Sequence, residues 1–179
     1  MDNTSFIGTP LEKFAQIQLR NIKKAELYPD YKFPAAYDDI AVVELNKPVT
    51  LNNIVWPICI PGTSYPDPDH LRRTGALVVG YGRAKDGSDS VNQLRHKIRP
   101  QAGCKSRYNP DNAEPSLRRV INDTLPEKFG KGLICAGDRF SRRYGTCGGD
   151  SGAPLLHDIV EDYDTEVVTY ELLGVLHGG

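Results

Sequence analysis

The sequence is short of long apolar runs and of excess charge of either sign. Its 179 residues include 22 Lys and Arg against 23 Asp and Glu, and 39% are hydrophobic. The longest apolar runs, such as residues 75–80, fall far below the ~18 residues that cross a membrane. A near-neutral charge balance also argues against nucleic acid as the main partner. We therefore expect a soluble globular protein of about one domain, with no nucleic-acid and no membrane partner.

Cysteine is scarce, and its spacing offers no metal site. The four cysteines, Cys59, Cys104, Cys135 and Cys147, form neither a Cys-x-x-Cys pair nor the Cys/His spacing of a zinc site. They look like halves of disulfides, which persist in oxidising compartments. Residues 1–21 nevertheless lack the charged start, the apolar stretch and the cleavage site of a secretory signal. Because these observations conflict, we expect an N-terminal portion to be missing.

Turn-forming residues are abundant, with 17 Gly and 13 Pro, which favours short strands joined by tight turns. Alternating apolar positions in residues 13–28 predict a half-buried strand, with a short amphipathic helix as the alternative. The β-branched run at residues 40–45 predicts a short buried strand. Further strands are expected at residues 76–81, 91–99, 133–136, 155–156 and 167–176. A short helix is expected at residues 104–108, a charged insertion from there to residue 132, and a solvated loop at residues 158–164. The pattern indicates an all-β chain.

The sharpest local signal is the string TCGGDSGAP at residues 146–154. Glycines on both sides of Ser151 allow a tight turn that aims backbone amides at a reacting carbonyl and presents the hydroxyl as a nucleophile. A glycine-rich turn that contains a serine is also common without any chemistry. On the residues alone, both interpretations stay open.

This string closely resembles the active-serine loop of chymotrypsin-like, or trypsin-like, serine endopeptidases. Four more segments match family motifs in the expected order, namely residues 39–42 (DIAV), 55–61 (VWPICIP), 80–82 (GYG) and 134–137 (ICAG). The resemblance implies a chymotrypsin-like double antiparallel β-barrel. It makes residues 1–179 a partial protease domain with a truncated first barrel (residues 1–60), most of the second barrel (61–179) and a truncated C-terminus. The CGGDSG and PICIP segments are most similar to clip-domain or snake-type proteases of insects.

The resemblance assigns roles to four residues. Ser151 matches the nucleophile, Asp39 the carboxylate that orients the base, and the amides of Gly149 and Ser151 the oxyanion hole. Asp150 matches the residue that pairs with a newly freed N-terminal amine after zymogen cleavage. The alternatives are structural, since Asp39 can cap a turn and Asp150 can accept a hydrogen bond from a turn amide.

The general base is not where the family has it. In the family the histidine precedes the aspartate, whereas His70, His96, His157 and His177 all follow Asp39. Without an imidazole to accept its proton, a serine hydroxyl reacts slowly, and loss of a triad member costs several orders of magnitude in rate. We therefore expect that this chain is not an efficient peptidase.

The specificity pocket also departs from the family pattern. Gly145 stands at the pocket base, where trypsin-like members have an aspartate, so the resemblance implies a preference for uncharged side chains. His177 and Gly179 match the pocket wall, and a wall position is expected for His177 rather than a role as base. The resemblance further pairs Cys104 with Cys135 and places the partners of Cys59 and Cys147 outside the chain.

Three functions follow in order of expectation. The first is a secreted, extracellular serine endopeptidase acting on protein or peptide substrates, without metal or other cofactor, and represented here by an incomplete chain. The second is a non-catalytic protease homologue that binds a protease, an inhibitor or another protein partner. The third is an unrelated cytosolic protein, which only the absence of a secretory signal supports.

Overall fold

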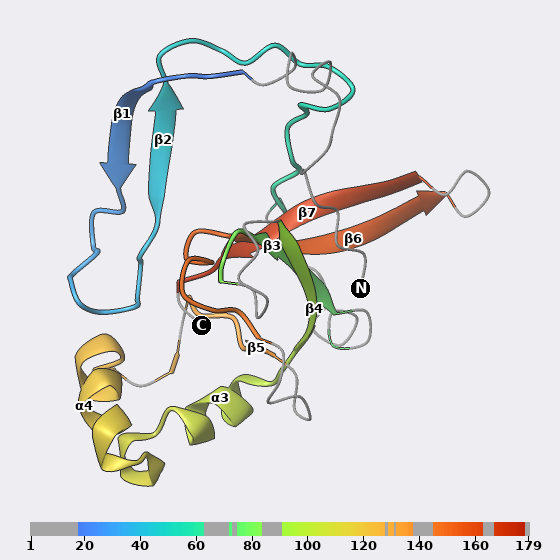
Figure 1. Cartoon of the computed structure of the whole chain (residues 1–179). Coiled ribbons are helices and arrows are strands. Elements are labelled where there is room, and N and C mark those ends of the chain that lie inside the picture. Colours follow the sequence, from blue (N-terminus) through green and yellow to red (C-terminus); the bar gives the residue numbers. More distant parts are fainter. Residues whose placement is uncertain are drawn as a thin grey trace.

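The computed structural model describes residues 18–62, 72, 75–83, 91–127, 129–130, 132–137, 145–162 and 167–177 (Figure 1). The strands are β1 (Ile22–Leu27), β2 (Ala41–Leu45), β3 (Ala76–Gly80), β4 (Asn92–Ile98), β5 (Ala136–Gly137), β6 (Pro154–Asp162) and β7 (Val167–Val175). The helices are α3 (Gln101–Arg107), the short 3-10 helix η1 (Pro110–Asn112) and α4 (Pro115–Thr124). None of the helices in these ranges is long and apolar enough to cross a membrane.

Every pairing between these strands is antiparallel. They form a two-stranded sheet, β1-β2, and a five-stranded sheet in the order β5-β4-β3-β6-β7. The expected antiparallel sheets are therefore confirmed, although the helices make the chain mostly stranded and not all-β. Within the described residues both sheets are open, and closed barrels are not formed.

The main core lies on one face of the five-stranded sheet. β3 alternates between buried and half-buried positions, with Ala76 and Val78 among the buried ones. Leu155 of β6 and Leu173 of β7 pack in the same cluster. This alternation follows from the two-residue period of a strand, which sends successive side chains to opposite faces. The core thereby fixes the ends of β3, β6 and β7 close to one another.

The prediction of a buried strand at residues 40–45 is wrong in its burial. The strand forms as β2, but all of its residues are exposed, and Val42 is 70% exposed. β2 pairs only with β1, and this ribbon stands apart from the larger sheet (Figure 1). A β-branched run indicates a preference for strand geometry, whereas burial depends on what packs against the strand.

Three further segments differ from expectation. The charged insertion contains α4, which begins at Pro115, a residue suited to the first helical position because it lacks an N–H. The segment predicted as a solvated loop at residues 158–164 continues β6 as far as Asp162, because Asp158 pairs with Tyr170 of β7. The short helix expected at residues 104–108 is present as α3, although it begins earlier, at Gln101.

A second cluster ties the loop between β1 and β2 to the helical segment. Ala36 is buried with Leu125, Phe129 and Cys135, and its amide donates a 2.7 Å hydrogen bond to the carbonyl of Thr124. Cys135 is joined to Cys104 of α3 by a disulfide, which is the pairing that the resemblance implies. The part of the loop that contains Ala36 is thus held against the segment that the Cys104–Cys135 disulfide closes.

We predict a pH-dependent contribution from the ion pair between Arg95 of β4 and Asp158 of β6. Arg95 donates to both carboxylate oxygens, at 2.7 and 3.3 Å. The hydrogen bond from Arg95 lowers the pKa of Asp158 below its ordinary value. The stabilisation is therefore present above the unfolded-state pKa of ~3.9 and is lost as the pH falls through the lower folded-state pKa. Since both side chains are partly exposed, Asp158→Asn should lower the free energy of unfolding by only ~0.5 kcal/mol at pH 7.

Urea unfolding of the wild type and of Asp158→Asn at pH 7 and pH 3 measures this contribution. We expect the difference in unfolding free energy to shrink at pH 3. Glu44→Gln is a matched control, because Glu44 pairs with Lys23 where both side chains are more than half exposed. An undiminished Asp158→Asn difference at pH 3 would show that the ion pair is not its source.

Candidate active site

Ser151 lies at the tip of a tight turn that precedes β6. Gly149 and Gly152 on either side have φ values of 102° and 88°, in the left-handed region that favours glycine. The amide of Asp150 donates to the carbonyl of Cys147 at 3.0 Å, and that of Ala153 donates to the carbonyl of Asp150 at 2.9 Å. These successive turns leave Ser151 exposed. The glycines of the motif thus have the conformational role expected of them.

The carboxylate of Asp150 lies beneath this turn and holds it to the end of β3. Asp150 is buried, with Oδ1 accepting from the Gly82 amide at 2.6 Å and Oδ2 from the Cys147 amide at 2.9 Å. A 3.1 Å hydrogen bond from the Arg83 amide to the Gly148 carbonyl adds a second link. The contact with turn amides is therefore present in the structure. The ion pair with a freed N-terminal amine stays a prediction.

Gly80 and Gly82 are required by this carboxylate. A Cβ built at either position would overlap the side chain of Asp150. Glycine fits both positions because it leaves room for the Asp150 side chain against the backbone.

Two amides of the serine turn take no part in the backbone hydrogen bonds of the described residues. Within the described part of the chain, neither the Gly149 nor the Ser151 amide donates a backbone hydrogen bond. Donors of this kind can stabilise negative charge that develops on a carbonyl oxygen. An oxyanion hole at Gly149 and Ser151 stays a prediction.

Asp39 is placed by the loop that connects β1 to β2. Asp38 has a φ of 57°, and the amide of Ile40 donates to the carbonyl of Asp38 at 2.8 Å, so the chain turns sharply at Asp39. The hydroxyl oxygen of Tyr37 accepts a 3.1 Å hydrogen bond from the Glu127 amide, which secures the approach to this turn. The Asp39 side chain remains 38% exposed.

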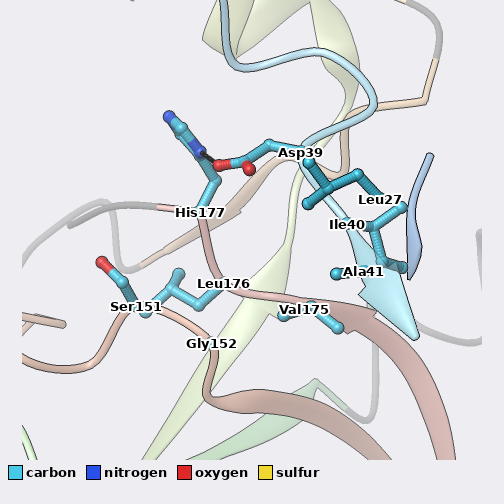
Figure 2. A pocket seen from close by; sticks show the side chains of 9 residues that line it. All are labelled: Leu27, Asp39, Ile40, Ala41, Ser151, Gly152, Val175, Leu176 and His177. Carbon is cyan, nitrogen blue, oxygen red and sulfur yellow. Dashed lines mark hydrogen bonds and ion pairs between the residues drawn. The ribbon is translucent and has the colours of Figure 1, made fainter. Parts of the chain in front are cut away.

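Asp39, Ser151 and His177 come together in one pocket (Figure 2). Nδ1 of His177, which follows β7, lies 2.5 Å from Oδ2 of Asp39. The cavity measures about 480 Å³. Its lining residues are Leu27, Asp39, Ile40, Ala41, Ser151, Gly152, Val175, Leu176 and His177.

The remaining predicted site residues lie elsewhere. Gly145 is exposed and is not among the residues that line this pocket, and Gly179 lies outside the described residues. Cys59 and Cys147 are free, exposed thiols. Among the described residues no group of three or more His, Cys, Asp or Glu side chains could hold a metal ion.

The contact of His177 with Asp39 was not anticipated from the sequence, which favours a place in the pocket wall for His177. A usable signal was that the strand expected before His177 directly follows the strand expected after Ser151, because strands that are consecutive in sequence often pair as neighbours. The register agrees, since the amide of Gly152 donates to the carbonyl of Leu176 at 2.7 Å.

Comparisons with known proteins agree on one family. A family sequence model described as Trypsin matches residues 4–179. Limulus clotting factor C from Carcinoscorpius rotundicauda is 30% identical over 153 residues, covering 84% of this chain and 13% of the relative. Transmembrane protease serine 11A from Homo sapiens is 30% identical over 176 residues, covering 97% and 35%. Trypsin, alkaline B, from Manduca sexta is 28% identical over 143 residues, covering 78% and 49%. The chain thus spans half or less of the length of these relatives.

Proposed function

This chain belongs to the trypsin family of serine proteases, and on that premise we propose that Ser151 is the nucleophile of a serine endopeptidase site in which Asp39 orients a histidine base. The observation that carries the proposal is that Ser151 and Asp39, far apart in sequence, line the same pocket. The Ser151 hydroxyl is exposed at the tip of its turn, and the Asp39 side chain is partly open to the cavity. In the proposed domain, residues 1–60 belong to the first barrel and residues 61–179 to the second.

The proposed chemistry is acyl transfer to Ser151. The hydroxyl oxygen attacks a peptide carbonyl, the base accepts the hydroxyl proton, and the amides of Gly149 and Ser151 stabilise the resulting oxyanion. The two amides are free for this purpose within the described residues. Because no histidine precedes Asp39 in this sequence, we propose that the 179-residue chain hydrolyses peptides slowly.

The proposed substrates are extracellular proteins or peptides, cleaved without a metal or other cofactor. Since the position that matches the pocket base is Gly145 and carries no carboxylate, the proposed specificity is for an uncharged side chain. The subgroup we propose is that of the clip-domain or snake-type proteases of insects. The competing function is a non-catalytic homologue that binds a protease or inhibitor, and the same experiment separates the two.

We predict weak, Ser151-dependent reactivity in the purified chain. Peptide hydrolysis should be at least ~1,000-fold slower than that of an enzyme with a complete triad, because an efficiently placed base is lacking. A fluorophosphonate probe should label the chain slowly, at Ser151. Labelling is measured by mass spectrometry over several hours, together with cleavage of a peptide library.

The controls are Ser151→Ala, which should not be labelled, and Ser116→Ala in α4, which should be labelled like the wild type. Fast Ser151-dependent peptide turnover would contradict the proposed slow hydrolysis. A folded chain that is never labelled at Ser151 would instead favour the non-catalytic binding function.

A further inference from the structure

One motif in the helical segment has no part in the proposed chemistry. Residues 122–124 read Asn-Asp-Thr, which fits the Asn-x-Ser/Thr pattern of N-glycosylation acceptors, where x is not proline. We propose that Asn122 is an N-glycosylation site and that its Nδ2 carries an oligosaccharide. The proposal rests on the extracellular location proposed above, because N-glycans are added to chains that enter the secretory route. It does not depend on the chemistry at Ser151.

The folded chain leaves room for a glycan at Asn122. On α4, Ile121 is buried, whereas Asn122 is exposed. Among the described residues the side chain of Asn122 forms no hydrogen bond, so substitution at Nδ2 breaks none there. In Figure 1, α4 lies outside both sheets, at the edge of the molecule. A bulky, hydrophilic group on Asn122 therefore extends into solvent without displacing the core.

Two other asparagines show which requirement each one meets. Residues 3–5 read Asn-Thr-Ser and also fit the pattern, but Asn3 lies outside the described residues. Asn112 at the end of η1 is exposed, but Ala and Glu follow it, so it lacks the hydroxyl of the pattern. Asn122 combines the pattern with exposure in the structure, which is what an acceptor in a folded glycoprotein needs.

The conformation of Thr124 indicates when the glycan is attached. Its hydroxyl donates to the carbonyl of Val120 at 2.8 Å, and its carbonyl accepts a 2.7 Å hydrogen bond from the Ala36 amide. The transferase must recognise that hydroxyl, since Ser and Thr alone satisfy the pattern. α4 has ten residues, and an isolated helix shorter than ~12–15 residues is marginal in water. Attachment therefore precedes the packing of α4.

The modification is a glycosyl transfer from a lipid-linked oligosaccharide pyrophosphate, which the secretory route supplies. Nδ2 of Asn122 attacks the anomeric carbon C1 of the first N-acetylglucosamine, and a C–N bond forms. The bond between C1 and the pyrophosphate oxygen breaks, so the lipid pyrophosphate leaves with that electron pair. One proton of the amide passes to a base of the transferase, and nothing is oxidised or reduced. The side-chain amide itself stays intact.

The test translates the full chain behind an added secretory signal in the presence of microsomes. Every chain carries Asn3→Gln, and only chains protected from added protease are scored. We expect one upward mobility shift that peptide-N-glycosidase F reverses, with enzymatic deamidation of Asn122 in the peptide mass spectrum. The shift should be lost in Asn122→Gln and in Thr124→Ala, and kept in Thr124→Ser, which retains the hydroxyl.

Asn112→Gln is the matched control, because it replaces an exposed asparagine outside the pattern and should keep the shift. The double variant Cys104→Ala, Cys135→Ala tests the timing, since that disulfide closes the segment that contains Asn122. Without the crosslink the segment folds less readily, so glycosylation should be at least as complete as in the wild type. Less complete glycosylation of this variant would overturn attachment before folding.

A membrane-protected chain without the shift would overturn the site, and so would a shift that persists in Asn122→Gln. Labelling of Ser151 by a fluorophosphonate in the same preparations tests the proposed function separately, because Asn122 does not line the pocket. A glycosylated, folded chain that is never labelled would overturn the nucleophile and leave the site at Asn122 standing.

Discussion

Replacing Gly82 with alanine is expected to destabilise the chain by about 3 kcal/mol and to abolish labelling of Ser151. A Cβ at this position would overlap the carboxylate of Asp150. Asp150 is buried and accepts hydrogen bonds from the buried Gly82 amide and the partly buried Cys147 amide, so it cannot move aside without leaving these donors unsatisfied. Each buried polar group that loses its partner costs ~1–3 kcal/mol. Because the same carboxylate supports the turn that carries Ser151, stability and reactivity should fall together.

The measurements are the free energy of unfolding in urea and the rate of fluorophosphonate labelling. Gly148→Ala is the matched control, because it adds a Cβ to the turn that Asp150 supports, at a position where that Cβ meets nothing within 4 Å. It should leave the unfolding free energy within ~0.5 kcal/mol of the wild type. If Gly82→Ala behaves like this control, the overlap with Asp150 is not a constraint on the chain.

A double variant separates the steric cause from a general loss of backbone freedom. Asp150→Ala alone should also destabilise the chain, since it removes the acceptor of two amide hydrogen bonds. In Gly82→Ala combined with Asp150→Ala, the overlapping carboxylate is gone. The combined loss of stability should therefore be smaller than the sum of the two single losses, which is the signature of residues in direct contact.

Short sequence patterns correctly predicted the turn at Ser151 and the strand β3, whose conformations depend on a few consecutive residues. The glycines around Ser151 predicted a tight turn. Two of them adopt positive φ values in the structure, a conformation that glycine adopts readily. The strand expected at residues 76–81 forms as β3, and its side chains alternate between buried and half-buried positions. Both features need only a few consecutive residues to be recognised.

What local patterns did not predict depends on distant parts of the chain. The exposure of β2 follows from the absence of a covering layer among the described residues, which composition does not encode. The extension of β6 into a charged segment follows from its pairing with β7, where Asp158 lies opposite Tyr170. In both cases tertiary context overrides propensity.

The candidate site divides in the same way. Ser151 and Asp39 could be selected from short motifs, whereas the hydrogen bond of Asp39 with His177 joins residues 138 positions apart. That contact depends on the register between β6 and β7, which shifts at an irregularity between Leu155 and Leu156. A one-residue change of register alters which side chains meet, so a motif alone does not locate such a contact.

The second large effect is expected from the disulfide between Cys104 and Cys135, which are 31 positions apart. Closing a loop of this size restricts the unfolded chain, and removing such a crosslink typically costs ~3 kcal/mol. We therefore expect the double variant Cys104→Ala, Cys135→Ala to lose about 3 kcal/mol of unfolding free energy in urea. Adding dithiothreitol should lower the wild type toward the variant and leave the variant unchanged.

This crosslink should also affect the pocket, because Cys135 packs against Ala36 in the loop that leads to Asp39. Loosening that contact frees the turn at Asp39, so labelling of Ser151 should slow in the double variant even under conditions where it remains folded.

Cys59→Ser is the matched control, since Cys59 is an exposed free thiol and its replacement should change the unfolding free energy by less than ~0.5 kcal/mol. A double variant that is destabilised but labels at the wild-type rate would show that the loop holds Asp39 without help from the disulfide. Unchanged stability would show that the crosslink does not restrict the unfolded chain, because loop-closure entropy is the source of the expected effect.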